Sequence, residues 1–286
     1  MHPVCMKKAL IIAVVLLVLL IVPPVALYYM VLGQVNSLPE NDPSRCNALE
    51  SGSRVLLVGD SITHGTVSFN YADSVASHLG DDYRVINAGI NRNLTHNVLL
   101  RMPELIECRA DVVTILIGTN DVNSTLHPVF LSNYRKTMGI EGTPDLQSYR
   151  ENLTQIVDGF KQSDPHMQIA LISLPVIGED LNSVANQRAM EYSRAIKKIA
   201  LEQGVAYLPL NEMQRSYLQG KETSNNQCNE PHLLIEKAVA RRYLLGMDYS
   251  EISKKNDFYL VTDCLHLNER AGAMISELVV GFIRDD

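Results

Sequence analysis

Four short segments of the sequence carry side chains that together could perform acyl transfer. They are GDSIT at 59–63, NAG at 87–89, GTND at 118–121 and DCLHLN at 263–268. A serine hydroxyl is a weak nucleophile at neutral pH and needs an adjacent base, which a carboxylate commonly orients. Asp263 and His266 stand three residues apart and have the types for these two roles. The sequence therefore predicts a catalytic triad of Ser61, His266 and Asp263.

Acyl transfer also needs hydrogen-bond donors for the oxyanion that develops on the carbonyl oxygen. The candidates are the backbone N–H groups of Ser61 and Gly89 and the side-chain amide of Asn120. Glycine suits a place where backbone approaches a ligand closely. We predict that these three donors form an oxyanion hole.

Each of these residues also has a structural alternative. Ser61 or Asp263 could cap a helix, while Gly89 and Asn120 could shape turns. His64 is closer to Ser61 in sequence but has no aspartate at comparable spacing, so we predict His266 as the base.

Further acidic positions near these segments are predicted to have structural rather than catalytic roles. Asp60 and Asp121 are expected to shape turns. The segment around Glu179 and Asp180, at the end of the fourth predicted strand, is expected to be a solvated loop, with a place in the lining of the site as the alternative.

The elements that would position these residues alternate along the chain. Apolar runs predict strands and 3.6-residue periodicity predicts helices. The predicted strands cover 54–58, 83–88, 111–117, 167–174 and 205–210, and the predicted helices cover 95–108, 146–162, 184–203 and 268–283. This alternation predicts an α/β fold with three α/β/α layers and a doubly wound, parallel, five-stranded, flavodoxin-like sheet. Functional groups gather at the carboxyl edge of such a sheet, where the four segments fall.

Two segments exceed this minimal pattern. Residues 122–143 are mostly loop-like, and residues 211–259 contain a helical piece at 233–245. Both would sit over the carboxyl edge of the sheet, where long insertions often form lids or binding loops.

The N-terminal part of the chain predicts membrane association. No charged residue occurs in 9–33, and Lys7 and Lys8 precede this run. The length and the positive flank predict a cytoplasmic tail at 1–8, a transmembrane signal-anchor at 9–33, a linker at 34–53 and the hydrolase domain at 54–286. The alternative is a signal peptide that is cleaved before secretion. Both place the domain outside the cytoplasm, in a periplasmic, extracellular or lumenal space.

Cysteines and sequons fit such a location without fixing its details. Cys46, Cys108, Cys228 and Cys264 would lie where disulfides persist, and four cysteines allow three pairings. Four isolated buried thiols are the alternative. N-glycosylation sequons begin at Asn93, Asn123 and Asn152 and would matter only in a eukaryotic secretory host.

Charge and motifs exclude nucleic-acid and nucleotide ligands. The formal net charge is −7, and no long basic block is present. The phosphate-binding patterns G-x-x-x-x-G-K-S/T and G-x-G-x-x-G after a strand are absent from the sequence. The oligomeric state stays open.

In order and position, the four segments resemble the conserved blocks of the SGNH/GDSL hydrolase superfamily, from about Arg54 to Ile283. The resemblance implies the Ser61–Asp263–His266 triad, the oxyanion groups of Gly89 and Asn120, and no metal or organic cofactor. The chain departs from the usual pattern after Gly89, where residues 90–92 read Ile-Asn-Arg. Residue 63 is threonine, so Ser61 is not in the G-x-S-x-G elbow of α/β-hydrolases.

The predicted function is a serine esterase, or acylhydrolase, acting through an acyl-enzyme. Its predicted substrates are short-acyl or O-acetyl esters of glycans, lipids or other small molecules. Two alternatives remain at this point. The same triad could transfer the acyl group to a sugar or another alcohol, or the fold could serve as a non-catalytic binding module.

Overall fold

The computed structural model describes residues 20, 22–48, 52–223, 228 and 230–284, and the chain divides into two compact units, Met1–Ser37 and Leu38–Asp286. In the first unit, residues 22–35 are helical, and apolar side chains such as Tyr28 and Tyr29 are exposed. Within the described ranges, no helix is both long and apolar enough to cross a bilayer. Residues 9–19 and 21 of the predicted anchor at 9–33 lie outside the described residues, so the membrane segment stays a prediction.

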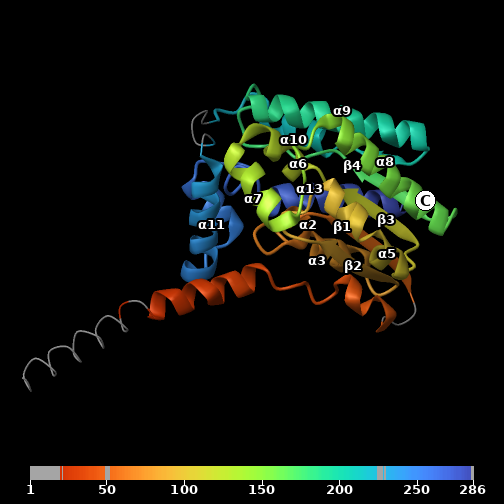
Figure 1. Cartoon of the computed structure of the whole chain (residues 1–286), viewed down its shortest axis with the longest axis horizontal. Coiled ribbons are helices and arrows are strands. Elements are labelled where there is room, and N and C mark those ends of the chain that lie inside the picture. The colour runs from red at the N-terminus through yellow and green to blue at the C-terminus, as the bar shows by residue number, and fades with distance from the viewer. Residues whose placement is uncertain (1–19, 21, 49–51, 224–227, 229, 285–286) are drawn as a thin grey trace, which may run out of the picture. The chain divides into compact units, whose positions relative to one another are not determined.

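The second unit is built on a parallel five-stranded sheet with the strand order β2-β1-β3-β4-β5 (Figure 1). The order is that of a flavodoxin-like sheet and confirms the predicted topology. All four pairings between neighbouring strands are parallel. The strands are β1 (Ser53–Gly59), β2 (Tyr83–Gly89), β3 (Val112–Leu116), β4 (Gln168–Ile172) and β5 (Ala206–Leu208).

Helices cover both faces of the sheet because its strands are apolar on both sides. In β1, Leu56 and Val58 pack into one core and Val55 and Leu57 into the other. The first core is completed by α4 (Thr95–Leu100), α5 (Met102–Glu107), α8 (Leu146–Ser163) and α9 (Val184–Gln203). The second is completed by α3 (Tyr71–Leu79), α10 (Leu210–Leu218) and α13 (Glu269–Arg284). These layers confirm the three-layer α/β/α prediction.

The predicted helix over 95–108 is in fact two helices. The helix is interrupted at Arg101, which is both the C-cap of α4 and the N-cap of α5, and Pro103 lies in the first turn of α5. Proline has no N–H for an intrahelical bond but fits a first helical turn, so a new helix starts there.

The loop-like prediction for residues 122–143 is wrong. This insertion forms α6 (Thr119–Leu126) and α7 (Pro128–Met138). Among the residues of α7, only Tyr134 is classed as buried, and it packs in a small cluster with Leu94 and Ile140. So small a buried face leaves no clear 3.6-residue period in the sequence.

The second insertion is also more helical than predicted. The expected piece at 233–245 is α11 (Pro231–Leu245), and α12 (Tyr249–Lys255) follows it. The start of the predicted insertion is itself helical, as α10.

The predicted linker at 34–53 ends earlier than expected. Its described part from residue 38 onward belongs to the same compact unit as the sheet and includes the 3-10 helix η1 (Pro43–Ala48). Asn87 of the edge strand β2 donates its backbone N–H to the carbonyl oxygen of Asn41, 3.0 Å away. Cys46 is buried and bonded to Cys108, which fixes this segment to the domain.

The structure pairs all four cysteines of the second unit, Cys46 with Cys108 and Cys228 with Cys264. The alternative of four isolated thiols is therefore wrong. Of the sequon asparagines, Asn93 and Asn123 are buried, whereas Asn152 is partly exposed. A glycan on either buried asparagine is incompatible with this fold.

Candidate active site

Ser61, His266 and Asp263 form a hydrogen-bonded chain, although 205 residues separate the serine from the histidine. The Ser61 Oγ lies 3.0 Å from the His266 Nε2, and the His266 Nδ1 lies 2.8 Å from the Asp263 Oδ2. All three side chains are buried. The structure thus brings together the three residues that the sequence singled out.

Ser61 owes its position to a sharp turn between β1 and the short helix α2 (Ser61–His64). Asp60 is the N-cap of α2, and its Oδ1 accepts a hydrogen bond of 2.9 Å from the backbone N–H of Ile62. The cap role that was an alternative for Ser61 therefore belongs to Asp60. Gly59 makes the turn possible, because a Cβ there would lie 2.0 Å from the Thr63 Oγ1.

The carboxylate of Asp263 is fixed by its own loop. Its Oδ1 accepts the backbone N–H groups of Leu265 and His266 at 3.1 and 2.9 Å, which leaves Oδ2 for the imidazole. Burial lowers the pKa of His266, but the charge of Asp263 and the hydrogen bond to it outweigh burial, so the pKa is raised overall. The site therefore favours a positive charge on this imidazole.

Gly89 lies at the end of β2, directly against the backbone of α2. A Cβ at this position would lie 2.1 Å from the backbone nitrogen of His64, so only glycine fits. Its N–H donates to the Asn87 Oδ1 at 3.0 Å. An oxyanion would have to displace that amide oxygen to reach the N–H of Gly89.

Asn120, the second residue of α6, has its amide held at both ends. Its Nδ2 donates to the carbonyl oxygen of Asn93 at 2.9 Å, and its Oδ1 accepts the hydroxyl of Tyr134 at 2.7 Å. An amide nitrogen has two N–H groups, so one remains beyond the bond to Asn93. Tyr134 was missed from the sequence because it lies on α7, in the segment predicted to be a loop.

Two buried carboxylates adjoin these groups. Burial raises the pKa of Asp60 to about 7, and its Oδ2 has no hydrogen-bond partner among the described residues. Burial also raises the pKa of Asp121 to about 6, partly offset by hydrogen bonds from Thr95. Asp121 holds the start of α4 through the Thr95 hydroxyl, which agrees with its predicted structural role.

Two further residues considered in the sequence analysis are His64, the alternative base, and Glu179, which was expected in a solvated loop. The His64 Nδ1 forms a hydrogen bond of 2.8 Å with the Thr66 Oγ1, whereas the Ser61 Oγ forms its hydrogen bond with the His266 Nε2. Glu179 is 1% exposed, so the prediction of a solvated loop is wrong at this residue. Its carboxylate accepts the backbone N–H groups of residues 259–261 and so fixes the chain just before Asp263.

Across the described ranges, no three His, Cys, Asp or Glu side chains are grouped so as to hold a metal ion. A serine hydroxyl, a buried imidazole and a carboxylate in series are the groups that nucleophilic acyl transfer requires.

Comparison with known proteins shows the family of this chain. A sequence model of the GDSL-like Lipase/Acylhydrolase family matches residues 57–270, which include all the candidate site residues. The chain belongs to the GDSL-like lipase/acylhydrolase family. It is accordingly a carboxylic ester hydrolase, and the alternative of a non-catalytic module is set aside.

Solved structures share the fold of this GDSL hydrolase. An acetylxylan esterase from Geobacillus stearothermophilus has a TM-score of 0.58 and 20% identity, with 82% of this chain and 95% of that chain covered. LAE5, an alpha/beta hydrolase enzyme from the metagenome of Lake Arreo in Spain, has a TM-score of 0.56 and 16% identity, covering 82% and 96%.

A curated relative comes from Mycoplasma pneumoniae and is an uncharacterized protein. It is 23% identical over 239 residues, which are 79% of this chain and 25% of that protein. The GDSL hydrolase described here thus spans about a quarter of that relative's length.

Proposed function

We propose that this GDSL hydrolase is a serine esterase that cleaves short-acyl or O-acetyl esters through an acyl-enzyme on Ser61. The observation that carries the proposal is the 3.0 Å contact between the Ser61 Oγ and the His266 Nε2, continued to Asp263. This distance is within the hydrogen-bonding range expected of a nucleophile and its base.

In this mechanism the Ser61 Oγ attacks the ester carbonyl carbon while its proton passes to the His266 Nε2. The oxyanion accepts hydrogen bonds from the Ser61 backbone N–H and from the remaining side-chain N–H of Asn120. The backbone N–H of Gly89 becomes a third donor when the Asn87 side chain moves away from it. Ser61 opens α2, and the first N–H groups of a helix have no intrahelical acceptor. His266 then protonates the leaving alcohol. Water attacks the acyl-enzyme with His266 as base, which releases the acid and restores Ser61.

Structural neighbours support both the roles and the substrate class. Catalytic mutants of the Geobacillus esterase replace a serine, an aspartate and a histidine, and the last two are three positions apart. Asp263 and His266 have the same spacing in this chain. The activity of that enzyme on acetylxylan favours acetylated glycans as substrates here, with lipid esters as the alternative.

The proposal is tested with purified protein, a fluorophosphonate probe and a substrate panel. The panel contains 4-nitrophenyl esters of increasing acyl length, acetylated xylan and a lysophospholipid, with a free sugar added to detect acyl transfer. We expect labelling at Ser61, shown by mass spectrometry of the labelled peptide, and fastest turnover of acetyl esters. Folded protein that neither reacts with the probe nor hydrolyses any ester would overturn the proposal.

The location of the enzyme is a second part of the proposal. We propose that residues 9–33 anchor the chain in a membrane and that the domain lies outside the cytoplasm. Two disulfides in the domain support an oxidising compartment, and the exposed apolar side chains of residues 22–30 support contact with lipid. A C-terminal alkaline phosphatase fusion should be active, and a fusion active only as a cytoplasmic reporter would contradict this topology.

The pH dependence of kcat/KM should follow His266. The imidazole must be neutral to accept the proton of Ser61, and its pKa is raised above 6.5. Activity is therefore expected to fall as the pH drops through a value above 6.5. The charge of Asp60 contributes to the raised pKa, although with a pKa of about 7 Asp60 is itself partly protonated in this range. Asp60→Asn should therefore move this acid limb by a small amount to lower pH while keeping a competent helix cap. A pH–rate profile of both proteins measures the shift, and an unmoved limb in Asp60→Asn would argue against the electrostatic coupling.

Tyr134→Phe should lower kcat about tenfold with little change in KM, less than the loss expected when an oxyanion donor is removed altogether. The reason is that the amide of Asn120 loses the hydroxyl that fixes its orientation. Tyr192→Phe is the matched control, because Tyr192 is fully buried but its hydroxyl has no partner among the described residues. In an Asn120→Ala background, Tyr134→Phe should cost nothing more. An undiminished tenfold cost in that background would assign Tyr134 another role.

A further inference from the structure

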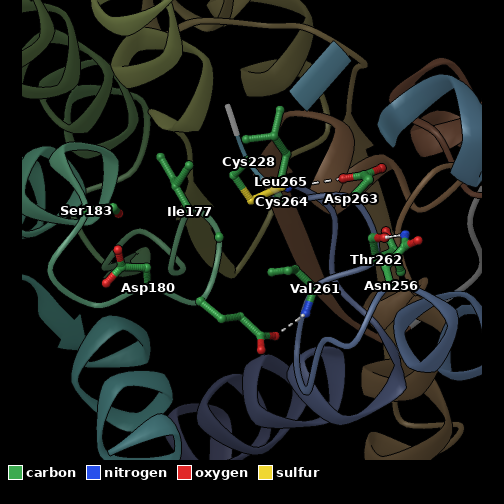
Figure 2. Close-up of a disulfide and its surroundings, with 12 residues drawn as sticks. Ile177, Asp180, Ser183, Cys228, Asn256, Val261, Thr262, Asp263, Cys264 and Leu265 are labelled. Atoms are coloured by element: carbon green, nitrogen blue, oxygen red, sulfur yellow. Dashed lines mark hydrogen bonds between the residues drawn. A yellow bond between two sulfur atoms is a disulfide. The ribbon is translucent and has the colours of Figure 1, made fainter. Parts of the chain in front are cut away.

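A disulfide is built into the segment that carries both Asp263 and His266. Cys264 lies between them, is fully buried, and is bonded to Cys228, 36 residues earlier in the second insertion (Figure 2). The sequence raised a disulfide here only as one of several options and gave it no role. Its position ties the candidate catalytic loop covalently to the insertion.

The backbone at Cys264 is in a conformation that a non-glycine residue rarely adopts. Its φ is 82°, in the left-handed region, where the Cβ is crowded by backbone. The carbonyl oxygen of Cys264 accepts the N–H of Gly178 at 2.7 Å. Rotation of the backbone at Cys264 would change the distance between Asp263 and His266. Contacts that fix the conformation of Cys264 therefore also fix the relative positions of these two residues.

The flanks of this segment have their own restraints. Before Asp263, the carboxylate of Glu179 binds the N–H groups of residues 259–261. After His266, Leu267 exchanges hydrogen bonds of 2.9 Å with Ser68 and Phe69. At Cys264 itself, the hydrogen bond from Gly178 and the disulfide add to the packing of this buried residue in the apolar core.

The disulfide also fits closely against the loop after β4. A Cβ on Gly178 would lie 2.9 Å from the Cys228 Sγ, and the φ of Gly178 is 65°. Gly178 therefore packs against the Cys228 Sγ and also donates its N–H to the carbonyl oxygen of Cys264. Loss of the sulfur–sulfur bond would leave the Gly178 hydrogen bond and the hydrogen bonds within residues 262–266 to hold an unfavourable backbone conformation.

We propose that the Cys228–Cys264 disulfide is a positioning element of the active site and makes the esterase sensitive to reduction. This inference rests on the proposed function. A dithiol reductant supplies two electrons and two protons, the sulfur–sulfur bond breaks, two cysteine thiols form, and the reductant becomes its own disulfide. Cys228 is only partly buried, so its sulfur is the reachable one.

The chain offers a matched control in its other disulfide. Cys46 and Cys108 are also buried and joined within the same unit, but neither lies in a segment that carries a candidate catalytic residue. The two double variants to compare are Cys228→Ser with Cys264→Ser, and Cys46→Ser with Cys108→Ser. Hydrolysis of 4-nitrophenyl acetate by each variant is measured at a temperature below the midpoint of that variant's thermal unfolding.

We expect the Cys228/Cys264 variant to lose at least tenfold in kcat with KM within twofold, and the Cys46/Cys108 variant to keep kcat within twofold. The acid limb of the pH–rate profile of the Cys228/Cys264 variant should also move toward pH 6.5. The reason is that a longer contact between Asp263 and His266 gives a smaller increase in the pKa of His266. A loss of stability alone would not move that limb. A folded Cys228/Cys264 variant with unchanged kcat and an unchanged acid limb overturns the inference.

A second measurement covers the case in which the Cys228/Cys264 variant does not fold. The Cys46/Cys108 variant, which retains only the disulfide of interest, is treated with dithiothreitol under native conditions. Loss of activity should track alkylation of Cys228 and Cys264, and reoxidation should restore it. Full activity after complete alkylation of both thiols rejects the inference. If untreated wild type neither hydrolyses esters nor reacts with fluorophosphonate, the proposed function itself has failed.

Discussion

Replacing Ser61 by alanine is expected to lower kcat/KM for acetyl esters by about 10⁴-fold or more. Alanine keeps the backbone N–H and the start of α2, since Asp60 caps that helix, but it removes the nucleophilic oxygen. The fold should be unchanged, so the loss should appear in kcat with little effect on the unfolding transition. Hydrolysis of 4-nitrophenyl acetate and circular dichroism measure the two effects.

Ser276→Ala is the matched control for this substitution. Ser276 is a buried serine of α13, and its hydroxyl bonds the carbonyl oxygen of Gly272 within the same helix. This variant should keep kcat and lose only a small part of its stability. Fluorophosphonate should label Ser276→Ala and leave Ser61→Ala unlabelled. Labelling of Ser61→Ala at another serine would assign the nucleophile to that residue.

Replacing Asp263 by asparagine is expected to lower kcat by about 10⁴-fold while leaving the geometry intact. The reason lies in the two backbone N–H groups, of Leu265 and His266, that point at Oδ1. An asparagine would keep its oxygen facing these donors and turn its NH2 group toward the His266 Nδ1. The imidazole would then carry its proton on Nε2, facing Ser61, and could not accept a second one as a base.

Asp257→Asn controls for the loss of one carboxylate from the same stretch of chain. Asp257 is exposed and has a φ of 52°, which asparagine tolerates well. It should retain kcat and stability. The tautomer change in Asp263→Asn can be followed by nuclear magnetic resonance of the His266 ring nitrogens. A kcat within tenfold of wild type would show that Asp263 does not set the tautomer.

Local sequence patterns predicted the sheet well. Each of the five strands overlaps its predicted apolar run, because strands buried on both faces need apolar side chains at nearly every position. The same logic failed for α7, where Tyr134 is the only residue classed as buried. A helix that packs through so few residues has almost no hydrophobic period to read.

The sequence predicted the catalytic residues of the candidate site but not the residues that hold them in position. Ser61, Asp263 and His266 could be named because nucleophile, base and orienting acid are distinct chemical types that follow strands or precede a helix. Glu179, by contrast, looked like an exposed acid. What makes it important is a set of backbone N–H groups some eighty residues away, and backbone groups leave no mark in a sequence.

The sequence by itself determined the order of the elements, the parallel sheet and the identity of the candidate catalytic groups. These follow from periodicity and from side-chain chemistry, which are local properties. Only the tertiary structure decided that Asp60 rather than Ser61 caps α2, that Tyr134 holds Asn120, and that Cys264 pairs with Cys228. Each of these is a contact or a choice between competing partners that exists only once distant segments have packed together.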